Sequence, residues 1–250
     1  AQHAQVQFMS ITQLADECGT AEATISRFCR SLKLKGFNAF KIELARHSAP
    51  AAKAQPHSTD TPAGRCQEVG RLATDAVHQT IELVQPQLIE QTVELIEQAP
   101  RVMCIGSGGS MVLASECAHM FSTVTGKFYS LADSHMQMSA AATLEQGSII
   151  MLFSYSGATT NGLQVLEVAR MRGIKTILIT RFPKSPAAKL ADIVLCCGSN
   201  EGPFQFGSVA AKIAQLVVVD VLFQEYFSRN REDCEKNIQS IASALSDMHV

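Results

Sequence analysis

The chain has 250 residues, of which 46% are hydrophobic, and its formal net charge is −2 at pH 7. This length supports one large domain, or a medium and a small one, with a real hydrophobic core. The near-neutral charge argues against a protein that coats nucleic acid or membranes along its whole length, and no uncharged run approaches the roughly 20 apolar residues of a membrane helix.

The charge is unevenly distributed along the chain. Residues 24–46 hold six Lys or Arg and a single acid, Glu43, whereas the chain from residue 48 onward holds 15 basic and 19 acidic residues. A basic end on a mildly acidic body indicates two functions, with nucleic acid a candidate partner of the basic end.

The eight cysteines include no CxxC pair, and most lie in apolar helix or strand patterns. This favours buried, reduced thiols in a cytoplasmic protein over a disulfide framework or a zinc site. No signal peptide is visible. We therefore expect a soluble cytoplasmic protein with no metal site.

Two short helices joined by a tight turn are predicted near the start of the chain. Apolar residues at 11, 14, 15 and 18 form one helical face that stops at Gly19, and a second helix over 23–34 buries Ile25, Phe28, Cys29 and Leu32. The pattern is that of a helix-turn-helix, whose second helix enters the DNA major groove. An ordinary αα-hairpin with a solvated basic face remains an alternative. The predicted DNA contacts are polar side chains on or just after the second helix: Thr24, Ser26, Arg27, Arg30, Lys33 and Lys35.

The run Ala23-Thr24-Ile25-Ser26-Arg27-Phe28-Cys29-Arg30, with Gly36-Phe37 and Phe40-Lys41 after it, resembles the DNA-binding domain of RpiR-type transcriptional regulators. The resemblance implies double-stranded operator DNA as a partner, and helix-turn-helix proteins usually bind it as homodimers or higher oligomers. This chain departs from the family pattern at Ala21, where a capping Ser is usual, and at Lys33, where a Gly is usual. The opening helices of the family are also missing, so we expect an N-terminally truncated chain.

A linker is predicted over 48–65, because residues 48–64 hold three prolines and almost no large apolar residue. It would separate a helix-turn-helix domain over 1–47 from a second domain over 66–250. Two helices are expected between Cys66 and Ile96, with Pro86 opening the second.

Strands and helices then alternate. Strands are predicted at 101–105, 127–131, 149–153, 176–180 and 193–196, and closing helices at 208–226 and 231–248. This order predicts an α/β fold with a doubly wound, five-stranded parallel sheet flanked by helices, preceded by the small all-α domain. Ligands of such sheets bind beyond the carboxyl ends of the strands.

Two turns rich in Ser and Gly fall at those ends. Ser154–Thr160 joins a buried strand to a helix and carries four hydroxyls, which indicates an anion site at a helix N-terminus. Simple N-capping of the helix is the alternative. The turn at 106–110 is an incomplete dinucleotide fingerprint, since Met111 occupies the sixth position, and no cofactor is expected.

The GxGxS and SxSGxT patterns of these turns together resemble the sugar isomerase (SIS) domain, over roughly residues 66–250. The resemblance implies a phosphosugar ligand, with phosphate contacts from the two turns and sugar contacts from three further residues. The implied effector-binding residues are Ser107, Gly108, Ser110, Ser154, Ser156, Gly157 and Thr159 for the phosphate, and His135, Glu201 and Lys212 for the sugar. The structural alternatives are a surface role for His135 and a snorkelling Lys212.

A transcriptional regulator that senses a phosphosugar accounts for both ends of the chain, and it requires no catalytic residue. One alternative is a phosphosugar isomerase with Glu201 or His135 as general base. Another is a phosphosugar-binding protein that does not bind DNA. By resemblance to regulators of amino-sugar use, an N-acetylated hexose 6-phosphate is the expected effector.

Overall fold

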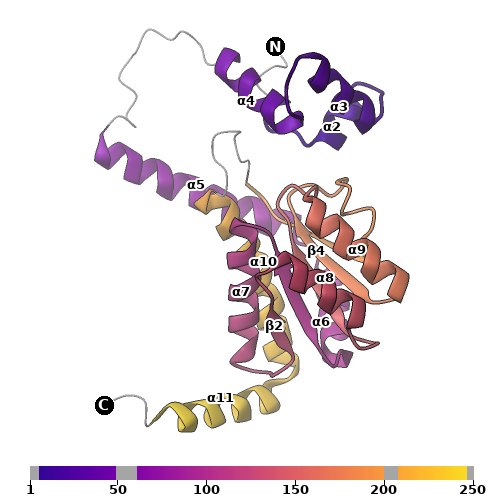
Figure 1. Ribbon diagram of the computed structural model, residues 1–250. Coiled ribbons are helices and arrows are strands. Elements are labelled where there is room, and N and C mark those ends of the chain that lie inside the picture. The colour runs from indigo at the N-terminus through magenta and orange to yellow at the C-terminus, as the bar shows by residue number, and fades with distance from the viewer. Residues whose placement is uncertain (1–5, 49–60, 200–207, 247–250) are drawn as a thin grey trace.

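The computed structural model describes residues 6–48, 61–199 and 208–246. Its body is a five-stranded, all-parallel sheet in the order β2-β1-β3-β4-β5, covered by helices on both faces (Figure 1). The strands are β1 (Val102–Gly106), β2 (Phe128–Ser130), β3 (Ile149–Phe153), β4 (Lys175–Thr180) and β5 (Ile193–Cys196). The predicted α/β fold and all five predicted strands are confirmed.

Seven helices of the described residues belong to this body. They are α5 (Pro62–Leu83), α6 (Pro86–Gln98), α7 (Gly109–Ser122), α8 (Ser134–Thr143), α9 (Thr160–Arg172), α10 (Val209–Arg229) and α11 (Arg231–Leu245). Pro86 opens α6 as predicted. Helix α5 begins earlier than expected, because the Thr61 side chain caps it by accepting from the Gly64 amide at 3.0 Å.

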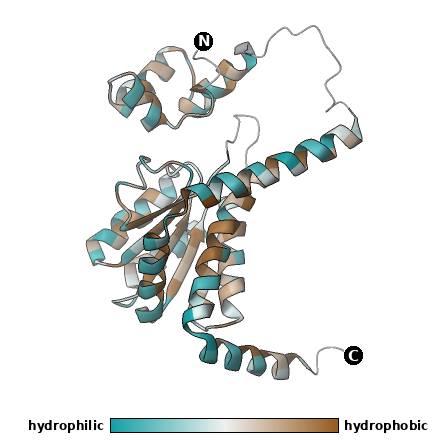
Figure 2. Cartoon of the chain, turned by 180° about the vertical axis from the view of Figure 1, so that it is seen from behind, coloured by the Kyte–Doolittle hydropathy of each residue, from teal (hydrophilic) through white to brown (hydrophobic). Residues whose placement is uncertain are grey.

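Each face of the sheet has its own hydrophobic core. Strands β1 and β3 are buried along their whole length, so alternate side chains enter opposite cores. Cys104 and Met151 face the core shared with α6, α7 and α10, whereas Met103 and Ile150 face the core shared with α8 and α9. Figure 2 shows the apolar residues concentrated in the strands and α10, while α5 and α11 carry long hydrophilic stretches. Within the described part of the chain, no helix combines the length and the apolar character that crossing a membrane requires.

The first helices confirm a helix-turn-helix but correct its predicted core. Helices α2 (Ile11–Glu17) and α3 (Glu22–Ser31) pack together, followed by α4 (Phe37–Ser48), so Ser48 belongs to a helix rather than to the predicted linker. Ile25 and Cys29 are buried, whereas Phe28 and Leu32 are about half exposed. The rings of Phe28 and Phe40 pack edge to face with their centroids 5.7 Å apart, and this contact leaves Phe28 partly exposed.

Most of the cysteines are buried, as expected, whereas Cys196 is partly buried and two are exposed. Cys104 and Cys117 lie in the core with their Sγ atoms 3.9 Å apart, and burial raises the pKa of the Cys117 thiol. Such thiols stay protonated and unreactive. Cys18 and Cys66 are exposed, because Cys18 ends a short helix and Cys66 lies in the first turns of α5.

The Asp192 carboxylate forms hydrogen bonds with the start of β4, and these predict that the stability of the protein depends on pH. The Asp192 carboxylate accepts from Lys175 Nζ at 2.8 Å and from the Thr176 amide at 2.9 Å. Partial burial acts to raise the pKa of Asp192, but these hydrogen bonds outweigh it and lower the pKa from its ordinary 3.8. The stabilisation is therefore present above pH 3.8 and is lost as the pH falls through the lower, folded-state pKa.

Asp192→Asn should consequently reduce the free energy of unfolding at pH 7 and flatten its dependence on pH below 3.8. Urea denaturation of both proteins between pH 7 and pH 3 measures this. Asp220→Asn, on the exposed side of α10, is the matched control. Parallel pH curves for wild type and Asp192→Asn would contradict the assignment.

Candidate functional site

The two Ser- and Gly-rich turns lie side by side at the switch point of the sheet. Strands β1 and β3 are neighbours, with Gly106 paired to Phe153, so the chain leaves both strands at the same edge. In a sheet of order 2-1-3-4-5, the connections run to opposite faces on either side of this pair, and the crevice between them is where ligands bind.

The first turn is closed so tightly that a side chain at Gly106 would not fit. A Cβ there would lie 2.6 Å from the Ser110 carbonyl oxygen. Gly108 adopts φ +56° as the N-cap residue of α7 and provides no capping side chain. The Ser110 amide donates to the Ser107 carbonyl oxygen at 3.1 Å, which holds both serines in one turn.

The second turn leaves the N-terminus of α9 without a side-chain cap from the described residues. Thr159 is the N-cap residue, yet its hydroxyl lies 3.3 Å from the hydroxyl of the buried Ser154. The Ser156 hydroxyl accepts from the Ala158 amide at 3.3 Å. The first amides of α9 and the positive end of its dipole therefore lack the partner that simple capping would supply, which favours the anion site.

Gly157 connects this turn to the segment after β4. Its φ is +59°, and a Cβ at this position would overlap the Ser185 side chain. The Ala187 amide donates to the Gly157 carbonyl oxygen at 2.9 Å, and the Thr180 hydroxyl donates to the Tyr155 carbonyl oxygen at 3.1 Å. Only glycine fits here, and these contacts pack the second turn against residues 180–187.

A cavity of about 170 Å³ opens between the first turn and α10. Its lining is Ser107, Gly109, Ser110, Leu113, Tyr155, Ala211, Lys212 and Gln215. The Lys212 side chain lies against the first turn, since a Cβ on Gly109 would be 3.6 Å from Lys212 Cε. The structure thus brings the predicted Ser107, Ser110 and Lys212 together, while Tyr155 joins the cavity to the second turn.

Sequence reasoning missed the side chain that ties these loops together. Gln137 of α8 is 1% exposed. Its Nε2 donates to the carbonyl oxygens of Gly106 at 3.0 Å and Leu131 at 2.7 Å, and its Oε1 accepts from Asn161 Nδ2 at 2.7 Å. One amide therefore fixes the ends of β1 and β2 and the first turn of α9. Its position among apolar helical neighbours carries no signal of this role.

One predicted sugar contact is not brought to the cavity. His135 is exposed in the first turn of α8 and does not line the cavity. Glu201 lies outside the described residues. The second turn contributes Tyr155 to this cavity, whereas its predicted phosphate contacts do not line it: Ser154, Ser156, Gly157 and Thr159.

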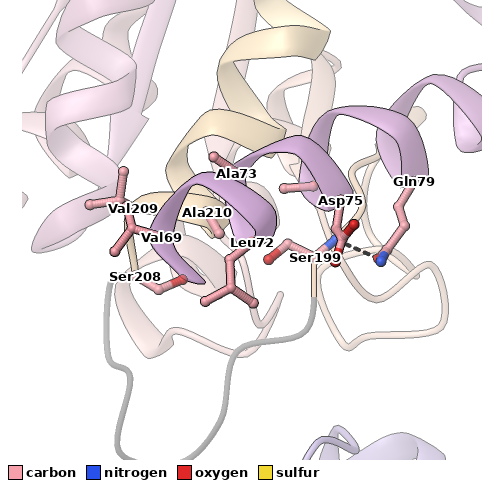
Figure 3. A pocket seen from close by; sticks show the side chains of 10 residues that line it. Val69, Leu72, Ala73, Asp75, Gln79, Ser199, Ser208, Val209 and Ala210 are labelled. Atoms are coloured by element: carbon pink, nitrogen blue, oxygen red, sulfur yellow. Dashed lines mark hydrogen bonds between the residues drawn. The ribbon is translucent and has the colours of Figure 1, made fainter. Parts of the chain in front are cut away.

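Two larger hollows lack the predicted residues. One of about 340 Å³ lies between α5 and the start of α10; Figure 3 shows Val69, Leu72 and Val209 facing it, with Ser199 beside Gln79. Another of about 580 Å³ lies between the α2–α3 turn and α9. Volume alone favours these, but neither lies at the switch point. The described lining of the first holds the acid Asp75 and no cation, and Lys189 in the second is accompanied by three acids, Asp16, Glu22 and Glu167. We therefore place the candidate site at the smaller cavity.

The candidate DNA interface is the exposed side of α3. Arg27 and Arg30 are exposed, Thr24 and Ser26 are partly buried, and Arg27 Nη2 donates to the Thr24 hydroxyl at 3.3 Å. Ala21 is the N-cap of α3 and forms no side-chain cap among the described residues. Lys33 and Lys35 are exposed beyond its end, and Lys33 adopts φ +61°, the left-handed conformation that explains why glycine is usual there.

Ion pairs connect the helix-turn-helix to the segment after β4. Lys189 Nζ lies 3.4 Å from Glu22 Oε1 in the first turn of α3, and Lys184 Nζ lies 4.0 Å from Asp16 Oδ2 in α2. The Thr12 hydroxyl also donates to Glu22, at 2.8 Å. The segment that packs against the second turn therefore also contacts both helices of the DNA-binding motif.

Comparisons with known proteins agree with both halves of the chain. Residues 95–224 match the SIS domain family, and residues 1–51 match the helix-turn-helix domain of the rpiR family. An uncharacterized HTH-type transcriptional regulator of Caldanaerobacter subterraneus is 31% identical over 241 residues, covering 95% of this chain and 86% of that protein. The HTH-type transcriptional regulator RpiR of Escherichia coli is 25% identical, covering 94% of this chain and 81% of that one.

A solved structure extends the similarity to the whole described fold. The Vibrio vulnificus NanR protein, complexed with ManNAc-6P, superposes with a TM-score of 0.88 at 27% identity, over 100% of this chain and 90% of that one.

Proposed function

Because this chain belongs to the family of transcriptional regulators that join an rpiR-type helix-turn-helix domain to an SIS domain, we propose that its effector is an N-acetylhexosamine 6-phosphate, bound at the two turns. The observation that carries the proposal is the pairing of an uncapped helix N-terminus with a cation-lined cavity at the switch point. The ManNAc-6P bound to the related NanR protein supports the choice of sugar class.

The phosphate is assigned to the second turn. There the free amides at the start of α9 donate to its oxygens, and the hydroxyls of Ser154, Ser156 and Thr159 rotate to donate as well. Ser110 approaches from the first turn, together with Ser107 and Gly108. Such donors favour a dianion over a neutral sugar, which accounts for a phosphosugar rather than a free sugar.

The sugar is assigned to the cavity beside Tyr155, where Lys212 supplies a cation. His135 and Glu201 remain proposed contacts of the sugar. His135 does not line this cavity, and Glu201 lies outside the described residues. An isomerase requires a general base within hydrogen-bond reach of the sugar carbons. Relatives that match this chain over both domains carry the name of transcriptional regulators, which favours sensing over catalysis.

Effector binding reaches the DNA-binding motif through the segment after β4. A ligand that tightens the second turn acts on Gly157, which packs against Ser185 and bonds to Ala187. The same segment carries Lys184 and Lys189, which pair with α2 and α3. Effector and DNA would then each favour one arrangement of these same contacts. By thermodynamic linkage, effector binding changes the affinity of the protein for DNA by the same factor by which DNA binding changes its affinity for the effector. We propose a homodimer as the DNA-bound form, which places two recognition helices on paired half-sites.

Thermal shift and turnover assays on one set of ligands test this function. The set comprises inorganic phosphate, a hexose 6-phosphate, a hexosamine 6-phosphate and an N-acetylhexosamine 6-phosphate. We expect the last to raise Tm most and none to be isomerised, because binding to the native state alone stabilises the protein. Ser156→Ala should weaken binding of all four, with the exposed Ser122→Ala on α7 as control. Steady isomerisation, or no shift with any phosphosugar, would overturn the proposal.

A further inference from the structure

A buried amide lines the cavity to which the sugar is assigned. Gln215 lies on α10, one turn after Lys212, and is 2% exposed. It borders the cavity together with Ser107, Ser110 and Tyr155. Most glutamines lie at the surface of proteins, so a fully buried one requires an explanation in terms of its hydrogen bonds.

Only one of the two polar atoms of the Gln215 side chain has a hydrogen-bond partner in the described structure. Gln215 Nε2 donates to the Ala211 carbonyl oxygen at 3.1 Å, whereas Gln215 Oε1 has no hydrogen-bond partner in the described structure. Turning the amide over would place Oε1 against the Ala211 carbonyl oxygen, and two acceptors cannot bond to each other. The unpaired group is therefore an acceptor.

The packing of α10 gives no reason for an amide at this position. The buried residues around it on the helix, Ala211, Ala214 and Val218, are apolar and pack against the core. An unbranched apolar side chain of similar length would fill the same space without burying an unpaired oxygen, which costs free energy.

We infer that Gln215 determines the sugar specificity of the site: its Oε1 accepts a hydrogen bond from a hydroxyl or amide N–H of the effector's sugar. The inference rests on the proposed function, because it requires that a phosphosugar occupies this cavity. The dianionic phosphate group of a phosphosugar offers only acceptor oxygens and is assigned to the second turn, so it does not pair with Oε1. Gln215 therefore contributes to the affinity for the sugar part and contributes nothing to the affinity for phosphate itself.

Calorimetric titrations of wild type and Gln215→Met test whether Gln215 contributes to the affinity for the sugar and not to the affinity for phosphate. The probes are inorganic phosphate, ManNAc-6P and analogues of ManNAc-6P that each lack one hydrogen-bond donor of the sugar, either one hydroxyl or the amide N–H. Gln215→Met should bind phosphate as wild type does but bind ManNAc-6P about tenfold more weakly, the effect of one net hydrogen bond. In wild type, one analogue should show the same tenfold loss, and in Gln215→Met that analogue and ManNAc-6P should bind alike.

The matched control is Ser148→Ala. Ser148 Oγ is a buried oxygen that likewise lacks a partner in the described structure, but it precedes β3 at the opposite end of the strand from the cavity. This variant should leave every affinity unchanged. Should Gln215→Met fail to fold, the wild-type analogue series still decides, because equal affinity for every analogue would overturn the inference.

The outcomes distinguish an error in the role of Gln215 from an error in the proposed phosphosugar-sensing function. Unchanged affinity of Gln215→Met for ManNAc-6P overturns the role of Gln215 while leaving phosphosugar sensing intact. An equal loss for phosphate and ManNAc-6P shows a structural effect and also overturns it. Failure of the wild type to bind any phosphosugar removes the proposed function, and the inference with it.

Discussion

Replacing Gly157 by alanine should abolish effector binding and lower the free energy of unfolding by about 3 kcal/mol. Gly157 has φ +59°, a conformation that costs a residue with a Cβ about 1–2 kcal/mol. The new methyl group would also overlap the buried Ser185 side chain, and relieving such an overlap typically costs a further 1–3 kcal/mol. The turn must move away from Ser185, which displaces the hydroxyls of Ser156 and Thr159.

Gly173→Ala is the control that separates these two contributions. Gly173 has φ +69°, but a Cβ there would meet open space. We expect this variant to lose about 1 kcal/mol and to retain full effector affinity. Urea denaturation and calorimetric titration of both variants give the comparison.

A second change tests the cause directly. Adding Ser185→Gly to Gly157→Ala removes both Ser185 side-chain atoms that the new methyl group would overlap, so stability and effector binding should partly return. If Gly157→Ala binds the effector as tightly as wild type, the second turn is not the phosphate site.

The fold was predictable because each strand is a short apolar run between turn residues. Ile149–Phe153 and Ile193–Cys196 have the predicted bounds, and the alternation with helices leaves a parallel sheet as the natural arrangement. The position of the two turns was predictable from this arrangement, because the carboxyl ends of neighbouring parallel strands lie at one edge of the sheet.

The residues that complete the site were not predictable from local pattern. Gln137 and Gln215 look like ordinary polar residues in helices. Gln137 donates to the carbonyl oxygen of Gly106, and Gln215 borders a cavity lined by Ser107 and Ser110, so their partners lie far away in the sequence. The exposure of Phe28 was missed because helical periodicity assigns a face to each residue but not the number of neighbours available to cover it. For Gln137, Gln215 and Phe28 alike, the surroundings of the side chain are set by tertiary packing and not by the local sequence.

The double change Arg27→Ala with Arg30→Ala should reduce operator affinity about 100-fold or more while leaving effector affinity unchanged. Both side chains are exposed on α3, three residues apart, so they project from one side of the helix. One is expected to reach a guanine edge, a contact worth about 1–3 kcal/mol, and the other a DNA phosphate. Loss of the phosphate contact should also reduce the slope of log affinity against log salt by about 0.9.

Duplexes selected by the wild-type protein from a random pool provide the operator for this measurement. Arg231→Ala is the matched control, because Arg231 is an exposed arginine of α11 that pairs with Glu235, far along the chain from the helix-turn-helix. It should leave both affinity and salt slope unchanged. Single variants then assign the roles, since loss of the base contact relaxes the sequence preference at one position while loss of the phosphate contact weakens all duplexes alike. Operator binding that survives the double change would place the recognition surface on another element.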